Sequence, residues 1–169
     1  MKVIYDDGGR SESGFKGNAG DCVTRAIAIV TGKSYKEVYD ALWDGINDFA
    51  HGKSKEAKLA SRGEGKLGTT PRNGVYKKVY DKYLKSIGMK WVPTMHIGSG
   101  CKVHLKEDEL PSGKIICRLS RHLTAVIDGV IHDTYDPQRG GIVTLYGKNH
   151  EEIFSKEIPE RCVYGYYTF

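Results

Sequence analysis

The spacing of apolar residues changes once along this 169-residue chain, and that change constrains the fold more than any other feature. Up to Gly88 apolar residues recur at helical intervals, whereas from Lys90 onward they form short runs between turn signals. Helices that come before strands, without alternation, are typical of an α+β domain rather than a βαβ fold. The length favours a single domain over residues 1–169.

Two helices are expected early in the chain. The first starts at Cys22, carries an apolar face, and ends at Gly32, which suits the left-handed residue that closes many helices. The second starts after Ser34, because Ser34 and Glu37 have the spacing of a capping box. Cys22 is therefore expected in the first turn of a helix.

A third helix is predicted to open at Thr70-Pro71 and to stop at Gly88. Residues 1–19 are expected to form an extended or loop lead-in. The polar, Gly-containing segment 52–70 is predicted to be a mobile loop. Its basic residues lie mainly within 53–66, where no aromatic residue is available for base stacking, so the segment favours a solvated surface over a nucleic-acid site.

The second half of the chain predicts a sheet. Asp128-Gly129 is a strong two-residue turn signal, and it should join its two flanking strands as a hairpin. The expected strands cover residues 90–95, 114–120, 122–127, 130–135, 142–146 and 162–169.

Composition and charge narrow the class of protein. Apolar residues make up 39% and charged residues 28% of the chain, as in ordinary globular proteins. The formal charge of +5 is mild, and no apolar run approaches the roughly 18 residues that span a membrane. No apolar leader follows Met1, so a cytoplasmic protein with four reduced cysteines is expected.

Cys22 has the position of a nucleophile. The positive end of a helix dipole lowers the pKa of a thiol in the first turn and makes the thiolate available near neutral pH. Asp21 opposes this effect, so a histidine is needed to take the proton or to form an ion pair. The other cysteines, Cys101, Cys117 and Cys162, are suited to small apolar positions.

His122 is the expected partner because it opens the first strand of the hairpin. If Asp128-Gly129 forms a two-residue loop, Asp133 falls on the same face as His122, displaced by two residues. Side chains in this diagonal relation can reach each other in a His–carboxylate hydrogen bond. A one-residue bulge would reverse the parity and favour Asp136 instead.

These segments resemble the papain-like cysteine peptidase superfamily. The resemblance is carried by Gly20-Asp-Cys22 at a helix start, Arg121-His-Leu-Thr-Ala-Val-Ile-Asp-Gly129, and Asp133-Thr-Tyr135. Asp136-Pro137 is similar to the Asp-Pro of bacteriocin leader peptidases in that superfamily, and the wider chain resembles small papain-like proteins of bacteria and their phages. The resemblance implies a helical part that carries the cysteine, followed by an antiparallel sheet that carries His and Asp.

The resemblance also implies a thiol-dependent hydrolase or acyltransferase that needs no cofactor and acts on a peptide or protein. Cys22 would attack an amide, isopeptide or ester carbonyl, His122 would move the proton, and Asp133 would orient His122 while an acyl-enzyme forms. The expected setting is the cytoplasm of a bacterium or of a phage-infected host cell.

The oxyanion site departs from the superfamily pattern. A Gln usually stands several residues before the cysteine, whereas here position 16 is Lys and the nearest amide is Asn18. Asn18 and the backbone N–H of Cys22 are the candidate donors to an oxyanion. Asn18 is equally compatible with a turn residue in Gly17-Asn-Ala-Gly20.

Two other interpretations stay open. His122, His132, Asp133 and Asp136 lie close together in the sequence, but strand alternation places His132 and Asp133 on opposite faces, which disfavours a shared metal. No zinc-ligand spacing is present. Alternatively, the chain is a catalytically inactive papain-like module that binds a protein or nucleic acid, an idea supported mainly by the basic residues of 53–66.

Overall fold

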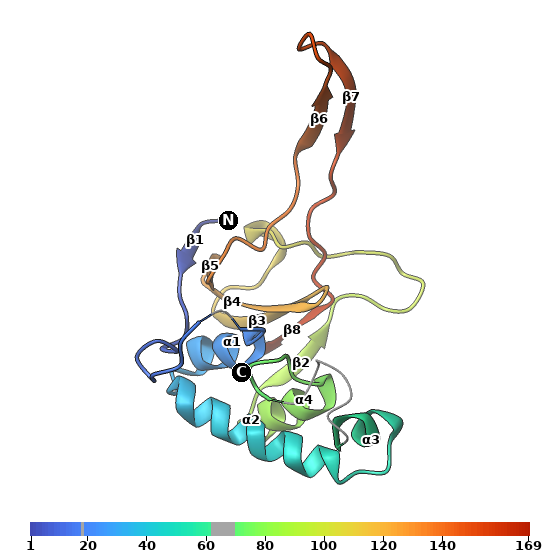
Figure 1. Ribbon diagram of the computed structural model, residues 1–169. Coiled ribbons are helices and arrows are strands. Elements are labelled where there is room, and N and C mark those ends of the chain that lie inside the picture. The colour runs from blue at the N-terminus through green and yellow to red at the C-terminus, as the bar shows by residue number, and fades with distance from the viewer. Residues whose placement is uncertain (18, 62–69) are drawn as a thin grey trace.

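The structure is a computed structural model, which describes residues 1–17, 19–61 and 70–169 (Figure 1). The α-helices found in these residues are α1 (Cys22–Thr31), α2 (Tyr35–Ala50), α3 (Lys55–Ser61) and α4 (Lys77–Ser86), with a 3₁₀ turn at Glu107–Glu109. The strands are β1 (Val3–Tyr5), β2 (Lys90–Pro93), β3 (Lys114–Leu119), β4 (His122–Ile127), β5 (Val130–Asp133), β6 (Ile142–Tyr146), β7 (Glu152–Glu157) and β8 (Gly165–Thr168). The α+β class is confirmed.

The main sheet has six strands in the order β1-β5-β4-β3-β8-β2. The β4–β5 hairpin has the predicted register, with Ile127 opposite Val130 and Ala125 opposite His132. The expectation of a purely antiparallel sheet was wrong in one respect, because β1 runs parallel to β5 and makes the sheet mixed. Val3–Tyr5 lie in the segment expected as an extended or loop lead-in, and no strand was predicted there because three residues give no readable alternation.

Helices α1, α2 and α4 cover one face of the main sheet (Figure 1). Their apolar stripes meet the sheet residues Ile116, Leu123, Ala125 and Tyr167 in the larger of two apolar clusters. The opposite face is covered by irregular chain, with Leu105 and Val163 packed against strand residues such as Val126. The start of β4 therefore lies beside the α1 helix.

Local signals at the first two helices were interpreted correctly. α1 ends at Gly32, which has φ 70° and donates its N–H to the carbonyl of Ala28 at 2.9 Å. Ser34 caps α2 by accepting a hydrogen bond from the N–H of Glu37 at 3.2 Å. The Glu37 carboxylate pairs with Lys33 instead, so the structure shows one half of the predicted capping box.

The third predicted helix begins later than expected. α4 starts at Lys77, because residues 70–74 are held against the lead-in to α1. Gly74 donates to the carbonyl of Gly20 at 2.7 Å, and the carbonyl of Pro71 accepts from the Thr24 hydroxyl at 2.9 Å. These long-range bonds occupy backbone groups that a helix from Thr70-Pro71 would need.

The predicted loop 52–70 contains a helix. α3 occupies Lys55–Ser61, with Ser54 accepting from the N–H of Ala57 at 3.0 Å and Ala57 buried. The loop prediction was therefore wrong for 55–61, because a single buried alanine gives no apolar stripe to recognise. Residues 52–54 and 70 lie in no helix or strand, and residues 62–69 lie outside the described residues.

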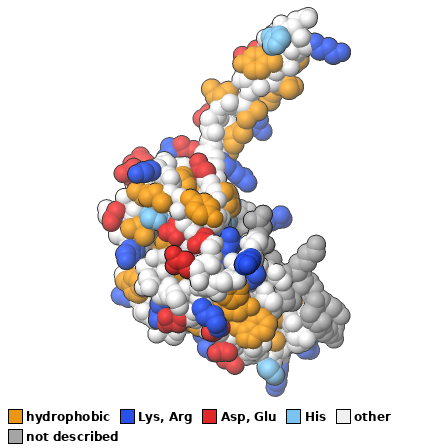
Figure 2. Space-filling model, turned by 60° about the vertical axis from the view of Figure 1, so that its left-hand side comes forward, with side chains coloured by type: hydrophobic (Ala, Val, Ile, Leu, Met, Phe, Trp, Pro, Cys, Tyr) orange, Lys and Arg blue, Asp and Glu red, His pale blue; other side chains and the backbone are white. Residues whose placement is uncertain are grey.

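A two-stranded hairpin, which we call the β6–β7 arm, projects from the body of the molecule (Figure 1). Apolar side chains are exposed along it (Figure 2). They are Ile142, Val143, Leu145, Tyr146, Ile153 and Phe154. Only the β6 half of the arm was predicted, since β7 has charged residues at both ends and no regular alternation of apolar and polar residues.

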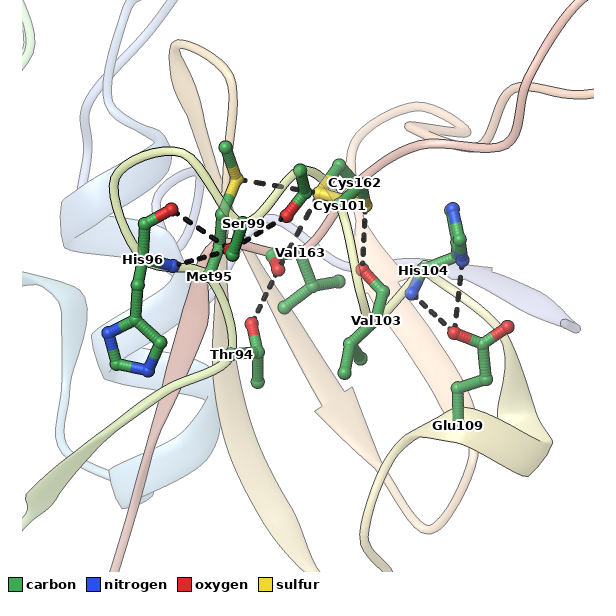
Figure 3. The surroundings of a disulfide bond; sticks show 11 residues. Thr94, Met95, His96, Ser99, Cys101, Val103, His104, Glu109, Cys162 and Val163 are labelled. Atoms are coloured by element: carbon green, nitrogen blue, oxygen red, sulfur yellow. Dashed lines mark hydrogen bonds and ion pairs between the residues drawn. A yellow bond between two sulfur atoms is a disulfide. The ribbon is translucent and has the colours of Figure 1, made fainter.

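Cys101 and Cys162 form a disulfide (Figure 3). The expectation of four reduced cysteines was therefore wrong for this pair, because sequence spacing cannot show that two distant residues meet. The disulfide joins the 94–101 loop to the segment that enters β8, where Thr94 also bonds the Val163 carbonyl (Figure 3). Within the described residues, no helix is long and apolar enough to cross a membrane.

Candidate active site

The predicted nucleophile lies where the sequence placed it. Cys22 is the first residue of α1 and is partly exposed. Asp21 precedes it, but the Asp21 side chain does not cap the helix. The positive end of the helix dipole therefore faces the thiol without a capping carboxylate.

His122 and Asp133 meet as the hairpin register predicted. The His122 Nε2 atom lies 2.6 Å from Oδ2 of Asp133, and both side chains are buried. The Asp133 carboxylate also accepts from the backbone N–H of Thr134 at 2.7 Å. Because Nε2 is hydrogen-bonded to Asp133, only Nδ1 of the imidazole is available to another partner.

The thiol of Cys22 is hydrogen-bonded to the His122 side chain and to the backbone N–H of Leu123. Burial alone would raise the pKa of the thiol. The hydrogen bond from His122 and the positive charge of its ring have a larger, opposite effect, so the pKa of Cys22 is lowered. Burial alone would lower the pKa of His122, but Asp133 and Cys22 raise it overall. Both directions favour a thiolate–imidazolium pair.

A buried arginine completes the site, and sequence reasoning missed it. Arg25, one helical turn after Asp21, donates from Nε to Asp21 at 2.9 Å and from Nη1 to Asp133 at 2.7 Å. Burial alone would raise the pKa of Asp133, but His122 and Arg25 together lower it to about 2. The Asp133 carboxylate is therefore held in its charged form.

Asp21 belongs to the same buried network. Its carboxylate accepts hydrogen bonds from Arg25, from the Tyr35 hydroxyl at 2.8 Å and from Arg10 at 3.3 Å. The expectation that Asp21 would oppose thiolate formation took no account of these partners. Its negative charge is compensated before it can act on Cys22.

Two tyrosines flank the pair. The ring of Tyr135 lies 5.1 Å from that of His122, centroid to centroid, and half of the Tyr135 side chain is exposed. Tyr80 is buried on α4 and hydrogen-bonds Arg118. A cavity of about 350 Å³ lies beside Tyr135, with Arg10 and Arg25 in its wall.

The remaining candidate residues of the sequence analysis are Asp136, His132 and Asn18, and the structure places neither Asp136 nor His132 in contact with His122. Asp136, the alternative orienting residue, accepts from the backbone and side chain of Gln138 rather than from His122. His132 pairs with Asp6 at 3.1 Å. Asn18 lies outside the described residues. Over the parts of the chain that are described, no group of three or more His, Cys, Asp or Glu residues is arranged to hold a metal ion.

Comparisons of the chain with protein-family models, curated proteins and solved structures return no match. Any function must therefore be argued from the geometry of this site.

Proposed function

We propose that the protein is a papain-like thiol hydrolase or acyltransferase that acts on an amide, isopeptide or ester bond of a peptide or protein. The observation that carries the proposal is the chain of contacts from the Cys22 thiol through His122 to Asp133. A cysteine with a lowered pKa, a histidine with a raised pKa and a buried carboxylate behind it form the constellation that nucleophilic acyl chemistry requires.

The chemistry follows from these charges. The Cys22 thiolate adds to the substrate carbonyl, and imidazolium His122 gives its proton to the leaving amine or alcohol as the carbon–heteroatom bond breaks. Neutral His122 then takes a proton from water or from an acceptor amine, which attacks the thioester and releases Cys22. Asp133 keeps the imidazole in one orientation and stabilises its charged form.

Cys22→Ala tests the proposal. A partly exposed thiol on the first helical turn fills little core volume, so the free energy of unfolding should fall by less than about 2 kcal/mol. A screen of fluorogenic peptide amides and esters should show activity that is lost in Cys22→Ala and in His122→Ala. Mass spectrometry of the wild-type protein mixed with an active ester should show one acyl group on Cys22.

The double variant gives a sharper result. Nucleophile and proton carrier act as one unit, so Cys22→Ala/His122→Ala should be little worse than either single variant. Folded single variants that keep full activity would contradict the proposal and leave a binding module as the better interpretation. Unfolding of Cys22→Ala would instead mean that the thiol supports the core.

A further inference from the structure

A second cavity, of about 420 Å³, opens toward the β8–β2 edge of the main sheet. Its walls are mostly apolar or aromatic, and no carboxylate from the described part of the chain lines it. The lining residues are Trp91, Pro93, Met95, Ile97 and Tyr164, together with Lys77, His96 and Arg118. We call this cavity the Arg118 pocket. Its volume is in the range of sites that take small ligands or single side chains.

The Arg118 pocket is linked to the candidate nucleophile through two neighbouring strands. Arg118 on β3 lies directly opposite Leu123 on β4, and the Leu123 N–H contacts the Cys22 thiol. Tyr80 on α4 links Arg118 to Cys22 from the helical side. It hydrogen-bonds Arg118; burial raises the pKa of Tyr80, and Cys22 lies close enough for the charge of a thiolate to raise that pKa further. The backbones of Leu123 and Arg118 are about one strand spacing, roughly 5 Å, apart, so a substrate held at Cys22 would extend across this pair toward the pocket.

Half-buried Arg118 has aromatic neighbours but no carboxylate partner among the described residues. Its guanidinium lies 5.7 Å from the centre of the Tyr164 ring, and it forms no ion pair with a carboxylate of the described residues. Lys77, at the other side of the pocket, is shared between Asp81 at 3.6 Å and the face of Trp91. A cation set between apolar walls binds an incoming carboxylate strongly, because little water competes for it.

We propose that the Arg118 pocket binds peptides in which a large apolar or aromatic side chain adjoins a carboxylate. The side chain would lie against Trp91 and Tyr164, and the carboxylate would pair with Arg118. This inference names the substrate class for the proposed thiol chemistry, on which its catalytic meaning rests, but the binding itself requires no reaction.

The pocket suits a peptide better than a nucleic-acid base. Trp91 has Lys77 over its ring at 4.9 Å, and the ring of Tyr167 lies 4.7 Å away, centroid to centroid. Gly165 is packed so closely that an added Cβ would lie 2.3 Å from the Trp91 ring. The faces of the Trp91 ring that a base would need for stacking are thus occupied, so an apolar side chain in the pocket would contact this ring at its edge.

The test uses tryptophan fluorescence. The chain has two tryptophans, so Trp43→Phe leaves Trp91 as the single reporter, and adding Cys22→Ala prevents turnover. The probes are acetyl-Gly-Phe-Glu-amide and its neutral counterpart acetyl-Gly-Phe-Gln-amide, titrated at low salt. We expect the Glu peptide to bind about tenfold more tightly than the Gln peptide.

Two variants in that background locate the effect. Arg118→Gln should bring the Glu-to-Gln ratio to about one, whereas Lys82→Gln, on an exposed part of α4, should leave it near tenfold. Circular dichroism checks that Arg118→Gln folds; if it does not, Lys77→Gln takes its place and should reduce the ratio.

Equal binding of the Glu and Gln peptides by the Trp43→Phe/Cys22→Ala protein would overturn the proposal. A Glu-to-Gln affinity ratio that stays near tenfold in Arg118→Gln would overturn it as well. Tighter binding of a single-stranded oligothymidine, with quenching of Trp91, would assign the pocket to nucleic acid. Because Cys22 is absent throughout, these outcomes are independent of whether the proposed catalysis fails.

Discussion

Arg25 shows how one residue changes the electrostatics expected from the sequence. Asp21, which precedes α1, and Arg25 are four residues apart, a spacing that predicts an ion pair in a helix. The second ion pair of Arg25, with Asp133, joins residues that are 108 positions apart. No sequence pattern gives that contact, because it depends on how α1 packs on the sheet. The meeting of His122 and Asp133 was thus predictable from the sequence, but the role of Arg25 in fixing the charge of Asp133 was not.

The first residue-scale prediction concerns thiol reactivity. Because the pKa of Cys22 is lowered, its thiolate should persist as pH falls below the range where an ordinary cysteine is protonated. Iodoacetamide should therefore alkylate Cys22 at pH 6 to 7 at least tenfold faster than it alkylates glutathione. Cys117 is an internal control, because burial raises its pKa to about 12 and it should react only after unfolding. A Cys22 rate that follows glutathione at every pH would contradict an activated thiol.

The second residue-scale prediction concerns acid stability. The pKa of Asp133 is about 2 in the folded protein against an ordinary value of 3.8, so its charge stabilises the fold above pH 4. This contribution should be lost as pH falls from 4 to 2. Asp133→Asn should cost on the order of 3 kcal/mol at pH 7, and the gap to wild type should narrow by roughly 2 kcal/mol at pH 2. Urea unfolding followed by circular dichroism measures both.

Asp136→Asn is the matched control for that experiment. Its carboxylate contacts Gln138 at the surface, so the free energy of unfolding should change by less than about 0.5 kcal/mol at either pH. A larger effect from Asp136 than from Asp133 would move the orienting role to the alternative residue.

At the scale of elements, prediction succeeded where the signals were local. The caps at Gly32 and Ser34 and the Asp128-Gly129 turn act within a few residues, so the limits of α1 and the hairpin register could be read from the sequence. α4 and β1 were misjudged because remote partners decide them. The backbone at 70–74 binds Gly20, and β1 exists only because β5 offers it an edge.

The capping of α2 gives a prediction at this scale. Ser34→Ala removes the bond to the Glu37 N–H and should lower the free energy of unfolding by about 1 kcal/mol. Thermal unfolding measures the loss, and the alkylation rate of Cys22 should stay unchanged. Ser54→Ala removes the equivalent bond from the seven-residue α3 and should have a smaller global effect, since that helix buries little. Equal losses would mean that α3 supports the whole fold.

At the scale of the whole molecule, the two halves of the chain meet at the candidate catalytic pair, Cys22 and His122. The helical half contributes Cys22 and the strand half contributes His122, so the site exists only when α1 packs beside the start of β4. The change in apolar spacing near residue 90 predicted this division. It predicted β6 as a strand but gave no sign that β6 and β7 form an arm, whose exposed apolar side chains belong to neither core.

The position of the disulfide has a consequence for a broken chain. The whole β6–β7 arm lies between Cys101 and Cys162 in the sequence. When a protease cuts the exposed arm, the disulfide therefore still joins the two pieces of the chain. The C-terminal piece also carries β8, which is held between β3 and β2 in the main sheet. A nicked protein should therefore run as one intact mass without reductant, separate into two fragments with it, and keep the alkylation rate of Cys22. Fragments that part without reductant would show that Cys101 and Cys162 are not joined.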